Sequence, residues 1–345
     1  MMIDRTSTLK VGIVGTGYAA KKRAEALKSD SRTELLVVTG NTPEKLQHFS
    51  QAYAVKGIDS WSRLVNLPEL DLIFICTINQ GCGAISKAAI LAGKHVVIEY
   101  PLSLDVKVAA EVIELATIKQ KLLHVEHIEI IGGLHQALKR YLPQIGQVFH
   151  ARYTTIAAQQ PVKQSWKYHR QMFGFPLAAA LSRIHRLTDL FGKVDQVTCH
   201  NRYWDLSGST TRLGKVGETD SLSRSDYFTA CFCNAQLNFR SGITAEVSYG
   251  KGDVFYRSHR TLEIYGEQGK IIFEGQKGTL ILPESEQEIP VTPRRGLFAQ
   301  DTAMVLDYLF YQKPLYIQPQ ASLYALQVAN AAEESSLTGK VIYFD

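Results

Sequence analysis

Short apolar runs alternate with amphipathic stretches over the first third of the chain. Strands are predicted at 10–15, 34–39, 71–77, 95–99 and 121–126, and the apolar runs that begin at Leu72 and His95 suit strands buried on both faces. Between them, apolar residues recur with a helical period at 18–29, 43–54, 82–92 and 105–119. This alternation of strand and helix predicts a parallel, doubly wound sheet of the Rossmann type.

The pattern changes at about residue 147, where apolar and polar positions begin to alternate with a period of two. Such stretches occur at 147–156, 196–204, 226–240, 243–249, 260–265 and 270–274. They predict a large antiparallel sheet, with a polar excursion at 205–224 and helices again at 298–312 and 320–337. We therefore predict an α/β dinucleotide-binding domain over 1–126 and an α+β substrate domain over 127–345.

A glycine-rich turn follows the first predicted strand. It reads Gly15-Thr16-Gly17-Tyr18-Ala19-Ala20, and a helical pattern follows at once. The first glycine permits a tight turn, the second lets a pyrophosphate approach the backbone, and the last alanine lets helix and strand pack closely. The helix N-terminus adds free N–H groups for the phosphates. We predict that these six residues bind a dinucleotide, and an ordinary β–α turn is the alternative.

The end of the second predicted strand bears on the choice of cofactor. It leads into Gly40, Asn41 and Thr42, with no carboxylate to bind a ribose 2′-hydroxyl or repel a 2′-phosphate. Asn41 and Thr42 can donate hydrogen bonds to a phosphate. Candidate cations nearby are Lys21, Lys22, Arg23 and Lys45, although 21–23 can equally form a solvated helix face. This pattern predicts NADPH, with NADH as a weaker possibility.

Composition excludes several classes of protein. The net charge of +5 is spread along the chain apart from 21–23 and 294–295, so a nucleic-acid-binding surface is not expected. No run of 18 apolar residues predicts a membrane span, and the first residues lack the apolar core of a signal peptide. Five scattered cysteines without metal-ligand spacing predict reduced thiols and a cytoplasmic protein.

The segment Glu99-Tyr100-Pro101 follows the fourth predicted strand. With the N-terminal turn, it makes the chain resemble the glucose–fructose oxidoreductase/inositol dehydrogenase family over nearly its whole length. That family joins a Rossmann domain to a C-terminal antiparallel sheet. Its members usually have lysine where Tyr100 stands, and a catalytic histidine where this chain has Arg186, next to His185. Both departures argue against polyol oxidation.

Further blocks resemble the biliverdin reductase branch of the family, and its cyanobacterial form in particular. They are Leu123-His-Val-Glu-His-Ile-Glu129, Thr77-Ile-Asn-Gln80, Phe173-Gly-Phe-Pro-Leu177 and Ala180-Leu-Ser-Arg-Ile184. The resemblance implies NADPH-dependent reduction of biliverdin IXα to bilirubin, with hydride transfer to the central methine carbon and protonation of a pyrrole nitrogen. It is compatible with a monomer or a homodimer. The alternatives are a sugar, polyol or other small-carbonyl oxidoreductase and a non-catalytic NADPH-binding sensor.

Three residues are candidates for the chemistry. Arg183 would stabilise charge on the pyrroles and orient a water that donates the proton, or would instead bind a propionate. Tyr100, in the loop after the fourth strand, would donate a hydrogen bond near the nicotinamide. Glu126 would contact the bilin nitrogens or hold a cation, and a structural salt bridge is the alternative.

Other side chains are expected to bind the ligands. A flat tetrapyrrole with two propionates needs aromatic and cationic neighbours, for which we predict Trp166, Lys167, Arg170, Phe173, Arg183, Arg186 and His127. The nicotinamide side of the cofactor is assigned to Thr77, Asn79, Gln80 and Glu99. We predict no metal site, because His124 and Glu126 share one face of a strand while His127 points to the other.

Overall fold

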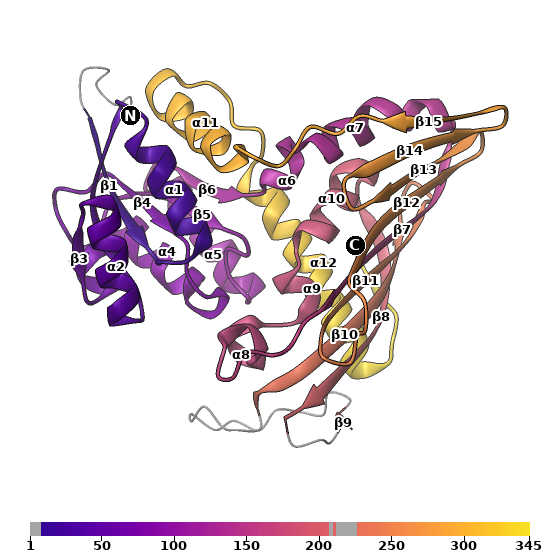
Figure 1. Cartoon of the computed structure of the whole chain (residues 1–345), viewed down its shortest axis with the longest axis horizontal. Helices are drawn as coiled ribbons and strands as arrows, with labels where there is room; N and C mark the ends of the chain where they lie inside the picture. The colour runs from indigo at the N-terminus through magenta and orange to yellow at the C-terminus, as the bar shows by residue number, and fades with distance from the viewer. Residues whose placement is uncertain (1–7, 207–209, 212–225) are drawn as a thin grey trace. The chain divides into compact units, whose positions relative to one another are not determined.

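The computed structural model describes residues 8–206, 210–211 and 226–345 (Figure 1). It divides into two compact units. The first contains Met1–Ile128 and Arg295–Leu323, and the second contains Glu129–Arg294 and Tyr324–Asp345. The first unit thus includes a late segment that the sequence analysis assigned to the substrate domain. Most of the polar excursion expected at 205–224 lies outside the described residues.

A six-stranded sheet forms the centre of the first unit. Its strands are β1 (Leu9–Val14), β2 (Thr33–Thr39), β3 (Lys56–Ile58), β4 (Leu72–Ile75), β5 (His95–Glu99) and β6 (Leu123–Glu126). They lie in the order β3-β2-β1-β4-β5-β6, and every pair is parallel. This confirms the predicted doubly wound sheet. The sequence analysis missed β3, because three residues are too few to show a period.

Helices cover both faces of this sheet, as expected for a doubly wound fold. They are α1 (Tyr18–Lys28), α2 (Pro43–Tyr53), α3 (Trp61–Val65), η1 (Asn79–Gly81), α4 (Cys82–Leu91), α5 (Val106–Ile118) and α11 (Leu297–Tyr311). Local chemistry sets where some of them begin: the Asp105 carboxylate accepts hydrogen bonds from two N–H groups of α5, and the Ser60 hydroxyl accepts one from α3. Helix α11 lies beside α1, and its Leu306 and Phe310 belong to the core of the unit.

A large mixed sheet forms the second unit. Its strands are β7 (Val148–Ala158), β8 (Val194–Asp205), β9 (Thr210–Thr211), β10 (Phe228–Phe239), β11 (Thr244–Gly252), β12 (His259–Gly266), β13 (Gly269–Glu274), β14 (Lys277–Leu282), β15 (Ser285–Ile289) and β16 (Ile342–Tyr343). The order is β15-β14-β13-β12-β7-β11-β10-β8-β16, with β9 paired to β8. The described pairs are antiparallel except β7 with β11. The predicted antiparallel sheet is therefore confirmed, with one parallel pair at its centre.

One face of this sheet is covered by helices (Figure 1). The helical segments are α6 (Ile128–Ile131), α7 (Gly133–Tyr141), η2 (Leu142–Ile145), η3 (Trp166–Tyr168), α8 (Arg170–Phe173), α9 (Pro176–Ala179), α10 (Ser182–Phe191) and α12 (Pro319–Thr338). Helices α9 and α10 contact β11, and α9 also contacts β10. The inward residues of these central strands therefore lie beneath the α9–α10 segment, where Arg183 is found. No helix in the described part of the chain has the length and apolar character needed to cross a membrane.

Candidate active site

The turn between β1 and α1 has the geometry that a bound pyrophosphate requires. Gly15 has a φ of 125°, and a Cβ atom there would lie 2.1 Å from the carbonyl oxygen of Cys76, so only glycine fits. At Gly17 an added Cβ would meet no atom within 4 Å, so this side of the backbone is open. No side chain caps the N-terminus of α1. The turn therefore presents a close-approach surface and free N–H groups to a phosphate.

A cavity of 430 Å³ lies beside this turn, within the first unit. Its walls include the predicted cofactor residues Gly15, Asn41 and Thr77. Ser60 and Trp61 also line it, although the sequence analysis did not identify them, because α3 is too short to show a pattern. Asp59 supplies a carboxylate to the lining, and Arg63 forms an ion pair with it at 2.9 Å.

Tyr100 and His127 lie together at the carboxyl ends of β5 and β6. Their rings are stacked, with centroids 5.0 Å apart and an angle of 5° between planes. His127 is buried, and its Nε2 lies 3.0 Å from the hydroxyl of Ser322. The predicted substrate residue His127 is therefore buried against the ring of Tyr100, and the stacking favours one plane for that ring. Tyr100 itself is half-buried.

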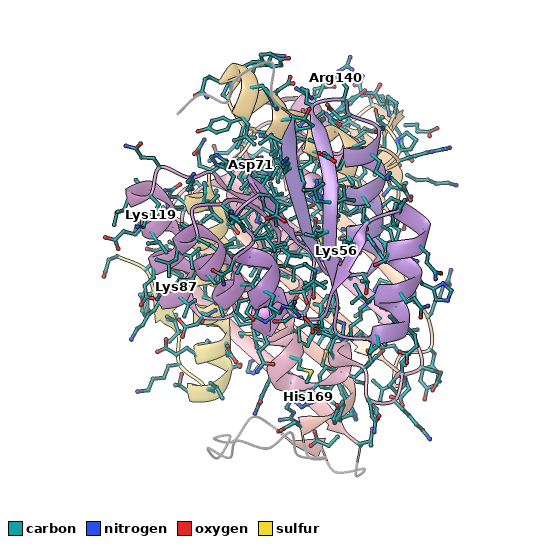
Figure 2. The ribbon with its side chains drawn as sticks, turned by 90° about the vertical axis from the view of Figure 1, so that its left-hand side faces the viewer. Lys56, Asp71, Lys87, Lys119, Arg140 and His169 are labelled. Carbon is teal, nitrogen blue, oxygen red and sulfur yellow. The ribbon has the colours of Figure 1, made fainter. Side chains whose placement is uncertain are left out.

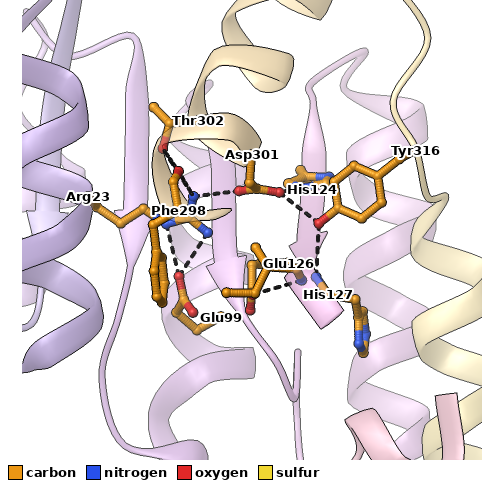
Figure 3. Close-up of polar contacts among 10 residues, drawn as sticks. Arg23, Glu99, His124, Glu126, His127, Phe298, Asp301, Thr302 and Tyr316 are labelled. Atoms are coloured by element: carbon orange, nitrogen blue, oxygen red, sulfur yellow. Dashed lines mark hydrogen bonds and ion pairs between the residues drawn. The ribbon is translucent and has the colours of Figure 1, made fainter. Parts of the chain in front are cut away.

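Arg23 forms the centre of a buried polar network in the first unit (Figure 3). Its side chain has 0% exposure, and its Nη1 donates to the carboxylate of Asp301 at 2.5 Å. Its Nε donates to Glu99 at 3.0 Å, and its guanidinium lies 5.0 Å from the ring centroid of Phe298. The suggestion that Arg23 faces a cofactor phosphate is wrong, because the guanidinium points into the protein and its charge is balanced by two carboxylates.

The same network continues to β6. His124 Nε2 lies 2.8 Å from Asp301, and the hydroxyl of Tyr316 donates to the same oxygen at 2.7 Å. Burial alone would raise the pKa of Asp301, but Arg23 and His124 outweigh it and hold that pKa below its usual range. Asp301 therefore remains a carboxylate and joins α1, β6 and α11.

Glu126 ends β6 directly opposite Glu99, which ends β5. Glu126 is buried and accepts a hydrogen bond from the backbone N–H of Ile128 at 2.9 Å. Burial and the neighbouring charge of Glu99 raise its pKa well above the usual value, against the opposing effect of Arg23. The structure thus places this candidate catalytic carboxylate inside the first unit, next to Glu99.

Arginines from α10 and from the sheet gather between this helix and the inner face of the sheet in the second unit. Arg183 is half-buried and donates to two neutral hydroxyls, those of Thr155 at 3.4 Å and Ser182 at 3.0 Å. Within the described ranges it forms no ion pair with a carboxylate. Arg186, one turn further along α10, is buried and forms an ion pair with Glu129 at 3.1 Å.

Tyr153 lies among these cations. It is buried on β7, and Arg260 donates to its hydroxyl at 2.8 Å. Burial would raise the pKa of Tyr153, but Arg186, Arg260 and Arg183 together lower it below its usual value. Glu129 lies near these arginines and also forms an ion pair with Arg294 at 2.5 Å. Several cations therefore gather on this part of the inner face, an arrangement that suits an anionic ligand.

The other predicted substrate residues come from one segment, Trp166–Phe173. Lys167 is exposed and Trp166 is half-buried, whereas Phe173 is buried in an aromatic cluster. Arg170 forms an ion pair with Asp205 and stacks 4.4 Å from the ring centroid of Tyr203. Arg170 and Phe173 therefore hold the segment on the sheet, and Trp166 and Lys167 are its more accessible members.

The remaining predicted cofactor residues lie around the carboxyl ends of the parallel strands. Asn79 is buried in η1, and Gln80 beside it is exposed. Thr42 precedes α2 as its N-terminal cap residue. His185, next to Arg186, is buried, and burial lowers its pKa to about 4. Within the described ranges no three His, Cys, Asp or Glu side chains are grouped so that they could hold a metal.

Comparison with known families identifies the class of protein. Residues 9–127 match an oxidoreductase family described by its NAD-binding Rossmann fold, and residues 143–344 match the C-terminal alpha/beta domain of that family. The chain belongs to this oxidoreductase family, and the resemblance inferred from its motifs is confirmed.

Particular members of known function are also similar to this chain. The crystal structure of a biliverdin reductase from Synechocystis sp. PCC 6803, in complex with biliverdin and NADP+, is 49% identical to this chain. The similarity covers 95% of this chain and 98% of that one, with a TM-score of 0.88. Mouse biliverdin reductase A is 29% identical over 202 residues, which are 56% of this chain and 63% of the mouse protein. The human protein is 30% identical over 130 residues, 38% of this chain and 41% of its own length. The chain therefore spans less than two thirds of these two mammalian relatives.

Substitution of the two turn glycines should separate folding from cofactor binding. Gly15→Ala forces a side chain into the left-handed region and against a carbonyl, and should cost about 1–3 kcal/mol of stability. Gly17→Ala should change stability by less than about 1 kcal/mol, because its methyl group meets open space. That methyl should weaken NADPH binding at least about tenfold by blocking the phosphate. Thermal denaturation and fluorescence titration with NADPH measure the two effects. Normal NADPH affinity in Gly17→Ala would contradict the assigned turn.

Removal of the buried guanidinium of Arg23 should lower the free energy of unfolding far more than removal of a surface ammonium. Arg23→Met leaves Asp301 and Glu99 without their cation and should cost about 3–5 kcal/mol in urea unfolding. The matched control is Lys87→Met. The side chain of Lys87 is 48% exposed at the surface (Figure 2), where it forms an ion pair with Glu111. Its removal should lower the free energy of unfolding by less than about 1 kcal/mol. Equal unfolding midpoints for the two variants would refute the structural role of Arg23.

Proposed function

We propose that this chain catalyses the NADPH-dependent reduction of biliverdin IXα to bilirubin. The proposal is supported by the Synechocystis relative, which is similar over nearly the whole chain and whose structure holds biliverdin and NADP+. The single observation that carries it within this molecule is the environment of Arg183. Its guanidinium is half-buried, donates to neutral hydroxyls and forms no ion pair within the described ranges, so its charge is available to a ligand.

The first unit fits a bound NADPH. Its turn admits a phosphate at Gly17, and the cavity beside the turn has Asn41 at the tip of β2. Lys21 and Lys45 are exposed and can approach a 2′-phosphate, whereas Lys22 is paired with Glu25 at 2.7 Å. Trp61 provides an aromatic surface in the cavity wall on which an adenine can stack. When bound, the reduced nicotinamide supplies a hydride.

The reaction needs one proton for each hydride that is transferred. A hydride on the central methine carbon brings two electrons into the conjugated system, and the negative charge that results spreads over the pyrroles. A proton on a pyrrole nitrogen completes the reduction to bilirubin. We assign Arg183 to stabilise that charge and to orient a donor water, because its own guanidinium stays protonated. Tyr100, oriented by His127, is assigned a second hydrogen bond to the reacting pair.

The arginine-rich inner face suits the two propionates of the substrate. Arg183, Arg186, Arg260 and Arg294 all lie close enough to the carboxylate of Glu129 to lower its pKa. Bidentate guanidinium–carboxylate pairing is the preferred contact of a propionate. Of these, the partly exposed Arg294 is assigned to a propionate and Arg183 to the developing charge, whereas Arg186 is buried.

An absorbance assay with biliverdin IXα and NADPH tests the proposal. The wild-type protein should convert the long-wavelength band of biliverdin into the shorter-wavelength band of bilirubin, faster with NADPH than with NADH. Arg183→Ala should lower kcat by about 10²-fold or more with little change in the KM for biliverdin, as expected when a donor to developing charge is removed. The control is Arg152→Ala, which removes an exposed guanidinium paired with Glu246 and should leave both constants unchanged.

Two outcomes would change this account. A raised KM with an unaltered kcat in Arg183→Ala would make Arg183 a propionate anchor. If the wild type produced no bilirubin but oxidised NADPH with a sugar or another carbonyl compound, the bilin assignment would be wrong.

A further inference from the structure

Lys251 is a buried lysine that has no assigned role in the proposed hydride transfer, protonation or propionate binding. It lies on β11 in phase with Ala245, Val247 and Tyr249, so its side chain points to the inner face of the sheet. The residue is only 3% exposed. Within the described ranges no carboxylate forms an ion pair with it. Burial of an ammonium without a counter-ion is costly, so this lysine calls for an explanation beyond packing.

Aromatic rings surround the ammonium in place of a carboxylate. Nζ lies 3.3 Å from the ring centroid of Phe173, 4.7 Å from that of Tyr168 and 5.2 Å from that of Phe228. It also donates a hydrogen bond to the backbone carbonyl of Lys167. The faces of aromatic rings attract a cation, and this attraction grows when water is excluded. The charge of Lys251 is therefore stabilised by groups that come from two different parts of the second unit.

Those groups come from two parts of the unit that pack against each other. Tyr168, Phe173 and the Lys167 carbonyl come from the segment Trp166–Phe173, whereas Phe228 comes from β10 of the sheet. The ammonium thus contacts η3, α8 and the sheet, and it stabilises the packing of these two helical turns on the sheet. This segment carries Trp166 and Lys167, the accessible side chains assigned to the bilin.

We propose that Lys251 is a positioning residue for substrate binding, whose ammonium holds the segment Trp166–Phe173 on the sheet in the conformation that receives the bilin. The proposal rests on the proposed function for the identity of the substrate. Loss of the positive charge removes the cation–aromatic attraction but leaves the rings and the aliphatic stem packed. The segment then loosens while the fold of the unit is retained, so substrate affinity falls and the chemical step is spared.

The ammonium of Lys251 loses its proton in a pH range in which enzyme activity can be measured. Burial lowers its pKa to about 8, and the like charge of Lys167 adds to this shift. Burial raises the pKa of Cys231 to about 12, so this thiol, directly opposite on β10, stays protonated. Arg170 and Asp205 form an ion pair on α8 and β8.

The remaining titratable groups of the cluster change charge outside this range. Burial raises the pKa values of Tyr168 and Tyr203, and burial lowers the pKa of His169. Asp253, just beyond β11, adds to the raised pKa of Tyr168. Lys251 is therefore the group of this cluster that loses its charge as the pH rises from 7 to 9.

The KM for biliverdin measured against pH tests the proposal. In the wild type, KM should rise about tenfold between pH 7 and 9.5 around a midpoint near 8, with little change in kcat. Lys251→Met should show the raised KM at pH 7 and no pH dependence, with an unchanged thermal midpoint. Lys251→Arg keeps the charge at all these pH values and should retain a low KM at pH 9.5. Lys167→Met leaves the backbone carbonyl in place and removes a like charge, so the midpoint should move to higher pH.

A second measurement does not depend on the substrate. In a background with Trp61→Phe and Trp204→Phe, the emission of Trp166 should change with a midpoint near pH 8, and Lys251→Met should abolish this change. A wild-type KM profile together with a wild-type fluorescence titration in Lys251→Met would overturn the proposal. So would a loss of kcat and thermal stability that Lys251→Arg fails to restore. Absence of biliverdin reduction by the wild type would refute the proposed function, and the fluorescence titration would then decide the role of Lys251.

Discussion

The ion pair between Arg23 and Asp301 holds the first unit together at its functional edge. A guanidinium with 0% exposure is stabilised there because Asp301 and Glu99 balance its charge and because Thr302 and the carbonyl of Phe298 accept further hydrogen bonds from its Nη1. Removal of Arg23 or of Asp301 would leave the other's charge buried in a medium of low dielectric without its closest counter-ion. The pair joins α1, which begins at the dinucleotide turn, to α11, which follows nearly three hundred residues later.

Glu99 links the network around Arg23 to Tyr100, one of the residues assigned to the reaction. Its carboxylate accepts from Arg23, and the next residue in the chain is Tyr100, whose ring stacks on His127. His127 in turn donates its backbone N–H to Tyr316, which donates its hydroxyl to Asp301. The residues at the ends of β5 and β6 are therefore positioned by one connected set of hydrogen bonds. In the second unit, by contrast, neutral hydroxyls accept hydrogen bonds from Arg183 and aromatic rings surround the ammonium of Lys251, and neither cation forms an ion pair within the described ranges.

Much of this could be predicted from the sequence, and the failures have physical reasons. The parallel sheet followed from long apolar runs, and the dinucleotide turn followed from Gly15 and Gly17 in their strand–helix context. Arg23 could not be placed, because a lone arginine in a lysine-rich helix gives no sign of a partner such as Asp301 that is distant in the chain. Trp61 lay in a five-residue helix with no readable period. Lys251 did leave a signal, since it stands in phase with the apolar residues of β11, and a lysine at such a position indicates burial.

The central claim is that the chain passes a hydride from NADPH to the central carbon of biliverdin. The most direct measurement uses NADPH with deuterium at the transferred position of the nicotinamide, followed by NMR of the purified product. Hydride transfer to that carbon predicts bilirubin with one deuterium at the central methylene carbon. Deuterium at another carbon, or a product that contains none, would contradict it.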